Sequence, residues 1–230
     1  MVSEQGKMVV ANWKAALSPV KVKQWLDVFR QRYRPVSGIE VVLAVPSLYL
    51  RQVYREVASL DGVAVAAQHV SPYPPGAYTG ALPAVWLAGM AGYTLAGHRE
   101  TRKYFHETLQ EVAGQVREAV SAGLVPILCM ERAVATAQIA AIDSGDLERT
   151  VLSYTPSDAV QLEVAHGARE VRDAAAFFSA LSGGRPVLYG GGVNRENIQE
   201  LMGVPELAGV MVGRSCLDVS EFLDLLETLR

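Results

Sequence analysis

The sequence predicts an α/β fold, a (β/α)8 barrel of eight parallel strands that forms a single domain over residues 1–230. Three observations predict it. Short and almost continuously apolar runs alternate with longer amphipathic stretches, and the alternation repeats eight times. No linker rich in Gly, Ser or Pro divides the chain. The length of 230 residues is one that such a barrel commonly has as a single domain.

The expected strands are short apolar segments, which is typical of parallel strands covered on both faces. They are residues 8–12, 40–45, 63–67, 93–96, 125–129, 150–154, 186–190 and 209–212. Strict alternation of strands with helices implies right-handed crossovers between parallel strands. Eight such units favour closure into a barrel, with an open doubly wound sheet as the structural alternative.

The expected helices have apolar residues at a spacing near 3.6 residues. In residues 18–34, Ser18 is the expected N-cap and Pro19 takes the first helical position. The other expected helices are residues 47–59, 109–122, 170–181 and 219–230. The proline-rich segment 71–80 is expected to be a long ordered loop after the third strand, and such loops are usually functional.

Composition and charge indicate a globular protein without a nucleic-acid or membrane partner. Half of the residues are apolar, a fifth are charged, and the net charge of −3 gives no reason to expect an anionic partner. The N-terminal residues lack the pattern of a signal peptide, and no apolar stretch is long enough to span a membrane. Cys129 and Cys216 are interpreted as reduced structural thiols, so a cytoplasmic protein is expected.

Neither a metal nor a cofactor is expected. The four histidines do not stand at ligand spacing with carboxylates or cysteines; they are His69, His98, His106 and His166. The glycine run 190–192 lacks the later spacing of a dinucleotide-binding fingerprint.

Polar residues follow the expected strands where a β/α barrel carries its functional groups. They include Asn12, Lys14, Gln68, His98, Glu100, Glu131, Thr155, Ser157, Asp158, Gly190, Gly191, Gly192, Gly213, Arg214 and Ser215. Lys14 and His98 would stabilise negative charge developing on an oxygen at one rim. Glycines after the last two strands leave backbone N–H groups unobstructed, which is typical of phosphate sites. The pattern predicts a mouth for a small anionic ligand.

Each feature also has a simpler interpretation. A single lysine such as Lys14 is usually a solvated surface residue, and His98 alone is compatible with a hydrogen-bonded core histidine. The glycines 190–192 are compatible with a tight turn. Glu100 is compatible with a structural ion pair to Lys14. It is the combination of several polar sets, each directly after a strand, that favours a functional site.

Seven short segments stand out in their order along the chain: Asn12-Trp13-Lys14, Ala67-Gln68, Gly76-Ala77-Tyr78-Thr79-Gly80, Gly97-His98-Arg99-Glu100, Tyr104-Phe105-His106-Glu107, Tyr189-Gly190-Gly191-Gly192-Val193 and Val212-Gly213. In this order they resemble the motifs of the triosephosphate isomerase family. The resemblance implies a TIM barrel that binds a small phosphorylated sugar without a cofactor. It also implies interconversion of aldose and ketose triose phosphates through an enediolate.

The resemblance implies a role for each matching residue. Lys14 and His98 polarise the substrate carbonyl, Asn12 stands beside the lysine, and Glu100 orients this region. The phosphate is expected at Gly191, Gly192, Gly213 and Arg214. Residues 76–80 are expected to dock into a second subunit of a homodimer; the residues expected to take part in dimerisation are Gln68, Tyr78 and Thr79, with Thr79 near the active site of the partner.

The chain departs from the family pattern at the sixth strand. Thr155 stands where the family has the glutamate that moves the proton, and a hydroxyl is too weak a base for this at neutral pH. Residues 157–162 replace the mobile lid. Asp158 and Glu163 are the candidate replacement carboxylates, although Asp158 is better interpreted as a helix cap. Arg214 would either strengthen phosphate binding or fill the phosphate pocket.

Three functional hypotheses follow. The first is an aldose–ketose isomerase with a relocated base. The second is a catalytically inactive protein that binds a phosphosugar or regulates another process. The third is a lyase or aldol enzyme that uses Lys14 as a Schiff base.

Overall fold

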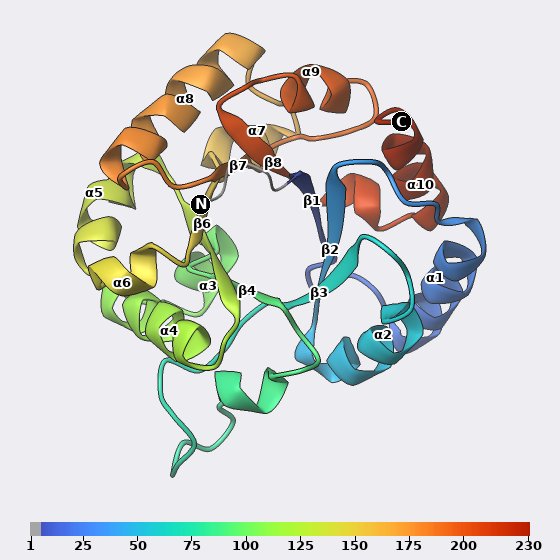
Figure 1. Cartoon of the computed structure of the whole chain (residues 1–230). Coiled ribbons are helices and arrows are strands. Elements are labelled where there is room, and N and C mark those ends of the chain that lie inside the picture. The colour runs from blue at the N-terminus through green and yellow to red at the C-terminus, as the bar shows by residue number, and fades with distance from the viewer. Residues whose placement is uncertain (1–5) are drawn as a thin grey trace.

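A computed structural model describes residues 6–230 and confirms the expected fold class. Eight parallel strands form a closed barrel in the order β1-β2-β3-β4-β5-β6-β7-β8, so the open-sheet alternative is wrong. The helices lie outside the ring of strands (Figure 1). The structure is therefore a (β/α)8 TIM barrel whose strand order follows the chain.

All eight expected strands are present, with ends that differ by at most two residues. They are β1 (Lys7–Asn12), β2 (Ile39–Val45), β3 (Val63–Ala67), β4 (Tyr93–Ala96), β5 (Val125–Met130), β6 (Val151–Tyr154), β7 (Val187–Tyr189) and β8 (Leu207–Val212). The largest difference is at β8, which begins two residues before the expected Gly209. A Cβ atom at Gly209 would lie 1.9 Å from the carbonyl oxygen of Met8, so β1 can pair closely only with glycine there.

The five expected helical regions are present, and the prediction of a cap at Ser18 is confirmed. Helix α1 (Pro19–Arg32) begins after Ser18, whose side chain accepts a hydrogen bond from the Lys21 N–H. The expected helix 47–59 is instead a 3-10 turn, η1 (Ser47–Tyr49), followed by α2 (Leu50–Val57). The other three are α4 (Leu109–Ser121), α8 (Ala168–Leu181) and α10 (Val219–Glu227).

Short helices that the sequence pattern does not predict complete the described chain. They are α3 (Arg99–Tyr104), α5 (Arg132–Ala140), α6 (Ser144–Leu147), α7 (Ser157–Leu162), α9 (Ile198–Met202) and the 3-10 turns η2 (Ala84–Leu87) and η3 (Arg214–Cys216). Among the helices of residues 6–230, none is long and apolar enough to cross a membrane.

Successive strand residues point alternately into the barrel and toward the helices, which gives two apolar layers. The inner layer contains Val10, Val42, Ala44, Ala66, Leu95, Ile127, Cys129, Leu188 and Met211. The outer and larger layer fills the space between the strands and the surrounding helices. Cys129 and Cys216 are buried and unpaired, and burial raises the pKa of the Cys129 thiol to about 12, so both read as structural.

The segment 71–80 forms the expected long loop, which extends away from the barrel between β3 and η2 (Figure 1). The Ser71 N–H donates to the carbonyl oxygen of Leu82 and ties the two ends of the loop together. Within the loop, the rings of Tyr73 and Tyr78 stack with centroids 4.6 Å apart, and both side chains are about half exposed.

Candidate active site

A cavity of about 460 Å³ opens at the carboxyl ends of the strands. Its lining consists of Asn12, Lys14, His98, Thr155, Val160, Glu163, Gly190, Gly191, Gly192, Val193, Asn194, Met211, Gly213, Arg214, Ser215, Leu217 and Glu221. The structure thus brings together most of the predicted site residues. Tyr78 and Thr79 belong to the protruding loop instead, and Glu100 and Gln68 lie behind the lining.

Lys14 is fixed at the rim from both its backbone and its side chain. Its φ of 48° is in the left-handed region, and its N–H donates to Asn12 Oδ1 at 3.0 Å. The ammonium lies 2.7 Å from Glu100 Oε1. Gln68 Nε2 donates to the carbonyl oxygens of Lys14 and Ala44 at 3.0 Å each, so Gln68 supports Lys14 within the same chain.

His98 is a buried neutral imidazole at the start of α3. Burial lowers the pKa of His98 to about 4, with Glu100 opposing this shift and Lys14 adding to it. The Glu100 N–H donates to His98 Nδ1 at 3.3 Å, so Nδ1 is an acceptor and the proton is carried by Nε2. A ligand oxygen in the cavity would therefore meet an N–H donor.

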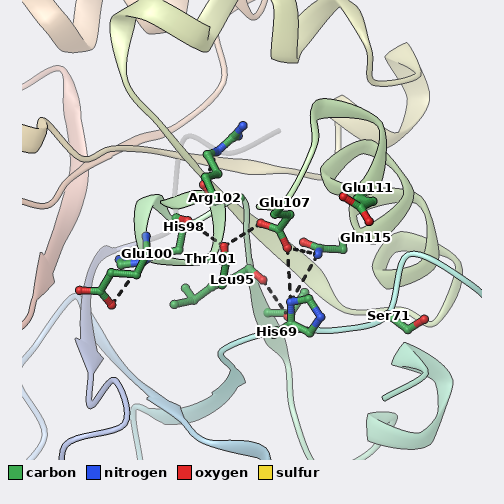
Figure 2. A network of polar contacts seen from close by, with 12 residues as sticks. His69, Ser71, Leu95, His98, Glu100, Thr101, Arg102, Glu107, Glu111 and Gln115 are labelled. Atoms are coloured by element: carbon green, nitrogen blue, oxygen red, sulfur yellow. Dashed lines mark hydrogen bonds and ion pairs between the residues drawn. The ribbon is translucent and has the colours of Figure 1, made fainter. Parts of the chain in front are cut away.

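A second polar network, not singled out by the site prediction, supports His98 from behind (Figure 2). Thr101 Oγ1 lies 2.7 Å from both the His98 carbonyl oxygen and Glu107 Oε2, and donates to one of these acceptors. The Glu107 carboxylate also accepts from Gln115 and lies 3.5 Å from His69 Nδ1. Burial raises the pKa of Glu107, but the hydrogen bonds from His69, Thr101 and Gln115 outweigh it and lower this pKa.

Thr155 lies at the end of β6 with its hydroxyl buried. The side chain is 3% exposed, and its Oγ1 has no hydrogen-bond partner among the described residues. Its methyl group packs on Gly190, where an added Cβ would lie 3.0 Å from Thr155 Cγ2. Buried polar groups are nearly always hydrogen-bonded, so this unpartnered hydroxyl is a destabilising feature of the cavity wall.

Asp158 does not cap α7, which corrects the expectation from the sequence. Pro156 takes the N-cap position and Asp158 lies in the first turn. Its Oδ2 is 3.1 Å from His166 Nε2, and Glu170 Oε1 is 3.0 Å from His166 Nδ1. Asp158 thus holds the end of the α7 segment, and it is not among the residues that line the cavity.

The α7 segment rests directly on the glycines that follow β7. An added Cβ at Gly191 would lie 2.8 Å from Ala159 Cβ. At Gly192, whose φ is 57°, it would lie 2.5 Å from the Ala165 nitrogen and 2.6 Å from the Val164 carbonyl carbon. The backbone after α7 therefore fills the space that a side chain at residue 192 would need, which explains glycine at this position.

The end of the cavity that is formed by the loops after β7 and β8 combines backbone donors with an ion pair. Within residues 6–230, the N–H groups of Gly191, Gly192, Gly213 and Arg214 donate no hydrogen bond. Arg214 Nη1 lies 2.5 Å from Oε2 of Glu163, a residue that ends α7 in the left-handed conformation. This end of the cavity can hold an anionic group. The Lys14 side chain reaches it as well, since its Cε would lie 3.8 Å from a Cβ atom at Gly213, and Lys14 and His98 can polarise a carbonyl oxygen of the same ligand.

Comparison with known proteins agrees with the resemblance seen in the sequence. The family model for triosephosphate isomerase matches residues 7–229. The chain is 32% identical to a triosephosphate isomerase of Deinococcus radiodurans, with 97% of this chain and 99% of that protein covered. It is 32% identical to a triosephosphate isomerase of Synechococcus sp., with 94% and 92% covered, and 29% identical to one of Streptococcus agalactiae, with 96% and 98% covered.

Proposed function

The chain belongs to the triosephosphate isomerase family, and on this premise we propose that it binds triose phosphates or a related small phosphosugar in the cavity. Lys14 and the neutral His98 would face the sugar carbonyl. The N–H groups of Gly191, Gly192 and Gly213, together with Arg214, would hold the phosphate. The volume of about 460 Å³ suits a ligand of this size.

We further propose that isomerisation on this chain is slow. Forming an enediolate requires a base that removes a proton from the carbon beside the carbonyl, and general-base catalysis contributes about 10²–10⁴ in rate. The observation that carries this proposal is Thr155, which lines the cavity together with Lys14 and His98 and brings no carboxylate to it. A hydroxyl can hold a ligand oxygen, but it does not accept a proton from carbon at neutral pH. The protein would then be chiefly a phosphosugar-binding member of its family.

The test combines binding with turnover. Calorimetry with 2-phosphoglycolate should give saturable binding, which His98→Ala weakens by removing the Nε2–H donor. A coupled assay on glyceraldehyde 3-phosphate should give a rate at least 10²-fold below that of a family member carrying the glutamate. Absence of heat with 2-phosphoglycolate would refute phosphosugar binding, and full turnover would refute slow isomerisation.

A second candidate is an active isomerase that uses another carboxylate. The observation in its favour is Glu163, which lines the same cavity as Lys14 and His98. In that case Glu163→Gln would abolish turnover. The matched control is Glu206→Gln, because Glu206 is also an exposed carboxylate paired with an arginine, Arg172, but lies outside the cavity. Equal effects of the two substitutions would reject this candidate.

Schiff-base chemistry at Lys14 has less support. The Lys14 ammonium is held 2.7 Å from the Glu100 carboxylate, whereas a lysine nucleophile needs an environment that favours its neutral amine.

We also propose a homodimer formed through residues 76–80. Support comes from the extension of this loop away from the barrel and from the half-exposed stacked rings of Tyr73 and Tyr78. Sedimentation of the wild type and of Tyr78→Asp tests the dimer, since the substitution should shift the protein toward the monomer.

We also propose a cytoplasmic location, which the two buried, unpaired cysteines favour.

A further inference from the structure

Both cations in the cavity wall are already paired with carboxylates of the chain. Lys14 Nζ lies 2.7 Å from Glu100, and Arg214 Nη1 lies 2.5 Å from Glu163. Among the residues that line the cavity, Lys14 and Arg214 carry positive charge, and Glu163 and Glu221 carry negative charge. The formal charges of the lining therefore cancel, although the proposed ligand is an anion.

Of these carboxylates, Glu163 is the one positioned to be displaced. It is about half exposed and lies at the end of α7, whereas Glu100 is more buried and lies behind Lys14. The backbone carbon of Glu163 lies beside Gly192, where an added Cβ would be 2.9 Å away. Glu163 thus meets Arg214 next to the glycine N–H groups at the anion-binding end of the cavity.

We propose that Glu163 makes an autoinhibitory contact: its carboxylate takes the place of the ligand's anionic group at Arg214 and must be displaced for that group to bind. This inference rests on the proposed phosphosugar function and deepens it. A phosphate dianion, with two negative charges and three terminal oxygens, competes for the guanidinium better than a carboxylate does. Glu163 therefore weakens the binding of anionic ligands at Arg214, and a phosphate group is the kind of anion strong enough to displace it.

The size of the effect follows from the exposure of the pair. An exposed ion pair changes an equilibrium constant by a factor of up to about five, because water and salt screen the attraction between its charges. Removing the Glu163 charge also removes its repulsion of a dianionic ligand. We therefore expect Glu163→Gln, which keeps the length of the side chain, to bind 2-phosphoglycolate on the order of tenfold more tightly than the wild type.

The experiment is calorimetry of 2-phosphoglycolate against the wild type, Glu163→Gln and the matched control Glu206→Gln, with urea unfolding to verify that each variant is folded. The control should stay within about twofold of the wild type, because it removes the same charge from an exposed arginine pair outside the cavity. In the background of Arg214→Gln, the gain from Glu163→Gln should fall to about twofold, because only the repulsion between Glu163 and the dianion is then removed.

The outcomes separate this inference from the function on which it rests. Binding to the wild type with no gain in Glu163→Gln would overturn the inference and leave phosphosugar binding standing. A gain in Glu206→Gln as large as that in Glu163→Gln, or a gain from Glu163→Gln that is undiminished without Arg214, would also overturn it. Absence of binding in every variant would overturn both proposals. Binding that appears only in Glu163→Gln would support the inference.

Discussion

Replacing Thr155 by valine removes a buried hydroxyl and keeps the shape of the side chain. In the ligand-free protein Oγ1 has no partner within residues 6–230, and the residue is 3% exposed. An unsatisfied buried hydroxyl costs about 1–3 kcal/mol. We therefore expect Thr155→Val to raise the free energy of unfolding by about 1 kcal/mol, which for a chain of this length raises Tm by roughly 2–4 °C.

The matched control is the same substitution at Thr94. This threonine is fully buried, and its Oγ1 donates to the carbonyl oxygen of Leu95 at 3.2 Å. Thr94→Val should lower the free energy of unfolding by about 1 kcal/mol, since it removes a satisfied hydrogen bond. Urea unfolding of the two variants should give shifts of opposite sign. Destabilisation of Thr155→Val to the extent of Thr94→Val would refute the claim that the Thr155 hydroxyl is unpartnered.

The same variant tests whether this hydroxyl faces the ligand. If the Thr155 hydroxyl bonds to a ligand oxygen, Thr155→Val should weaken 2-phosphoglycolate binding by about fivefold, the equivalent of one ordinary hydrogen bond. Greater stability together with lower affinity is the combined signature. Unchanged affinity would show that the hydroxyl points away from the ligand.

Three more predictions concern residues around the cavity: His98, Gly192 and Glu107. The pKa of His98 is lowered to about 4 from 6.5, so on acidification the unfolded chain takes up a proton first. The free energy of unfolding should therefore fall by on the order of 2–3 kcal/mol from pH 7 to pH 4. In urea unfolding, His98→Gln should lack this part of the pH dependence. Gly192→Ser should lower the free energy of unfolding by about 2 kcal/mol or more without improving 2-phosphoglycolate affinity, because the backbone at Ala165 fills the space. A gain in affinity would contradict the packing of the segment after α7 on Gly192. Glu107→Ala should lower the free energy of unfolding by about 2–3 kcal/mol and weaken ligand binding through His98. Glu111→Ala, at the exposed start of α4, should lower it by about 1 kcal/mol or less in thermal unfolding. Equal losses would show that the Glu107 network has no structural role.

The strands could be predicted well because their continuous apolar runs are a direct signature of burial on two faces. The short helices could not, since α3, α7 and α9 have five or six residues each and offer too few turns for a periodic pattern. The expected helix 47–59 is longer than α2, because the segment begins with a 3-10 turn that the apolar spacing does not distinguish from an α-helical turn.

The site was predictable where function depends on position directly after a strand. Lys14, His98 and Thr155 all line the cavity as their strand ends imply. The position of Glu163 was harder to predict from the sequence. Glu163 itself takes the left-handed conformation at the end of α7, where a glycine or asparagine usually marks such a turn. Gln68, assigned to the dimer from the family resemblance, hydrogen-bonds beneath Lys14.

Exchange of carbon-bound hydrogen into heavy water tests most directly whether a cavity that polarises the carbonyl lacks the base for proton transfer. Dihydroxyacetone phosphate is incubated in heavy water with an equal amount of protein, and the hydroxymethyl protons beside the carbonyl are followed by NMR. We expect the ligand to bind while its protons exchange no faster than without protein. Protein-dependent exchange that His98→Gln abolishes would show that a base works in this cavity and would contradict the account.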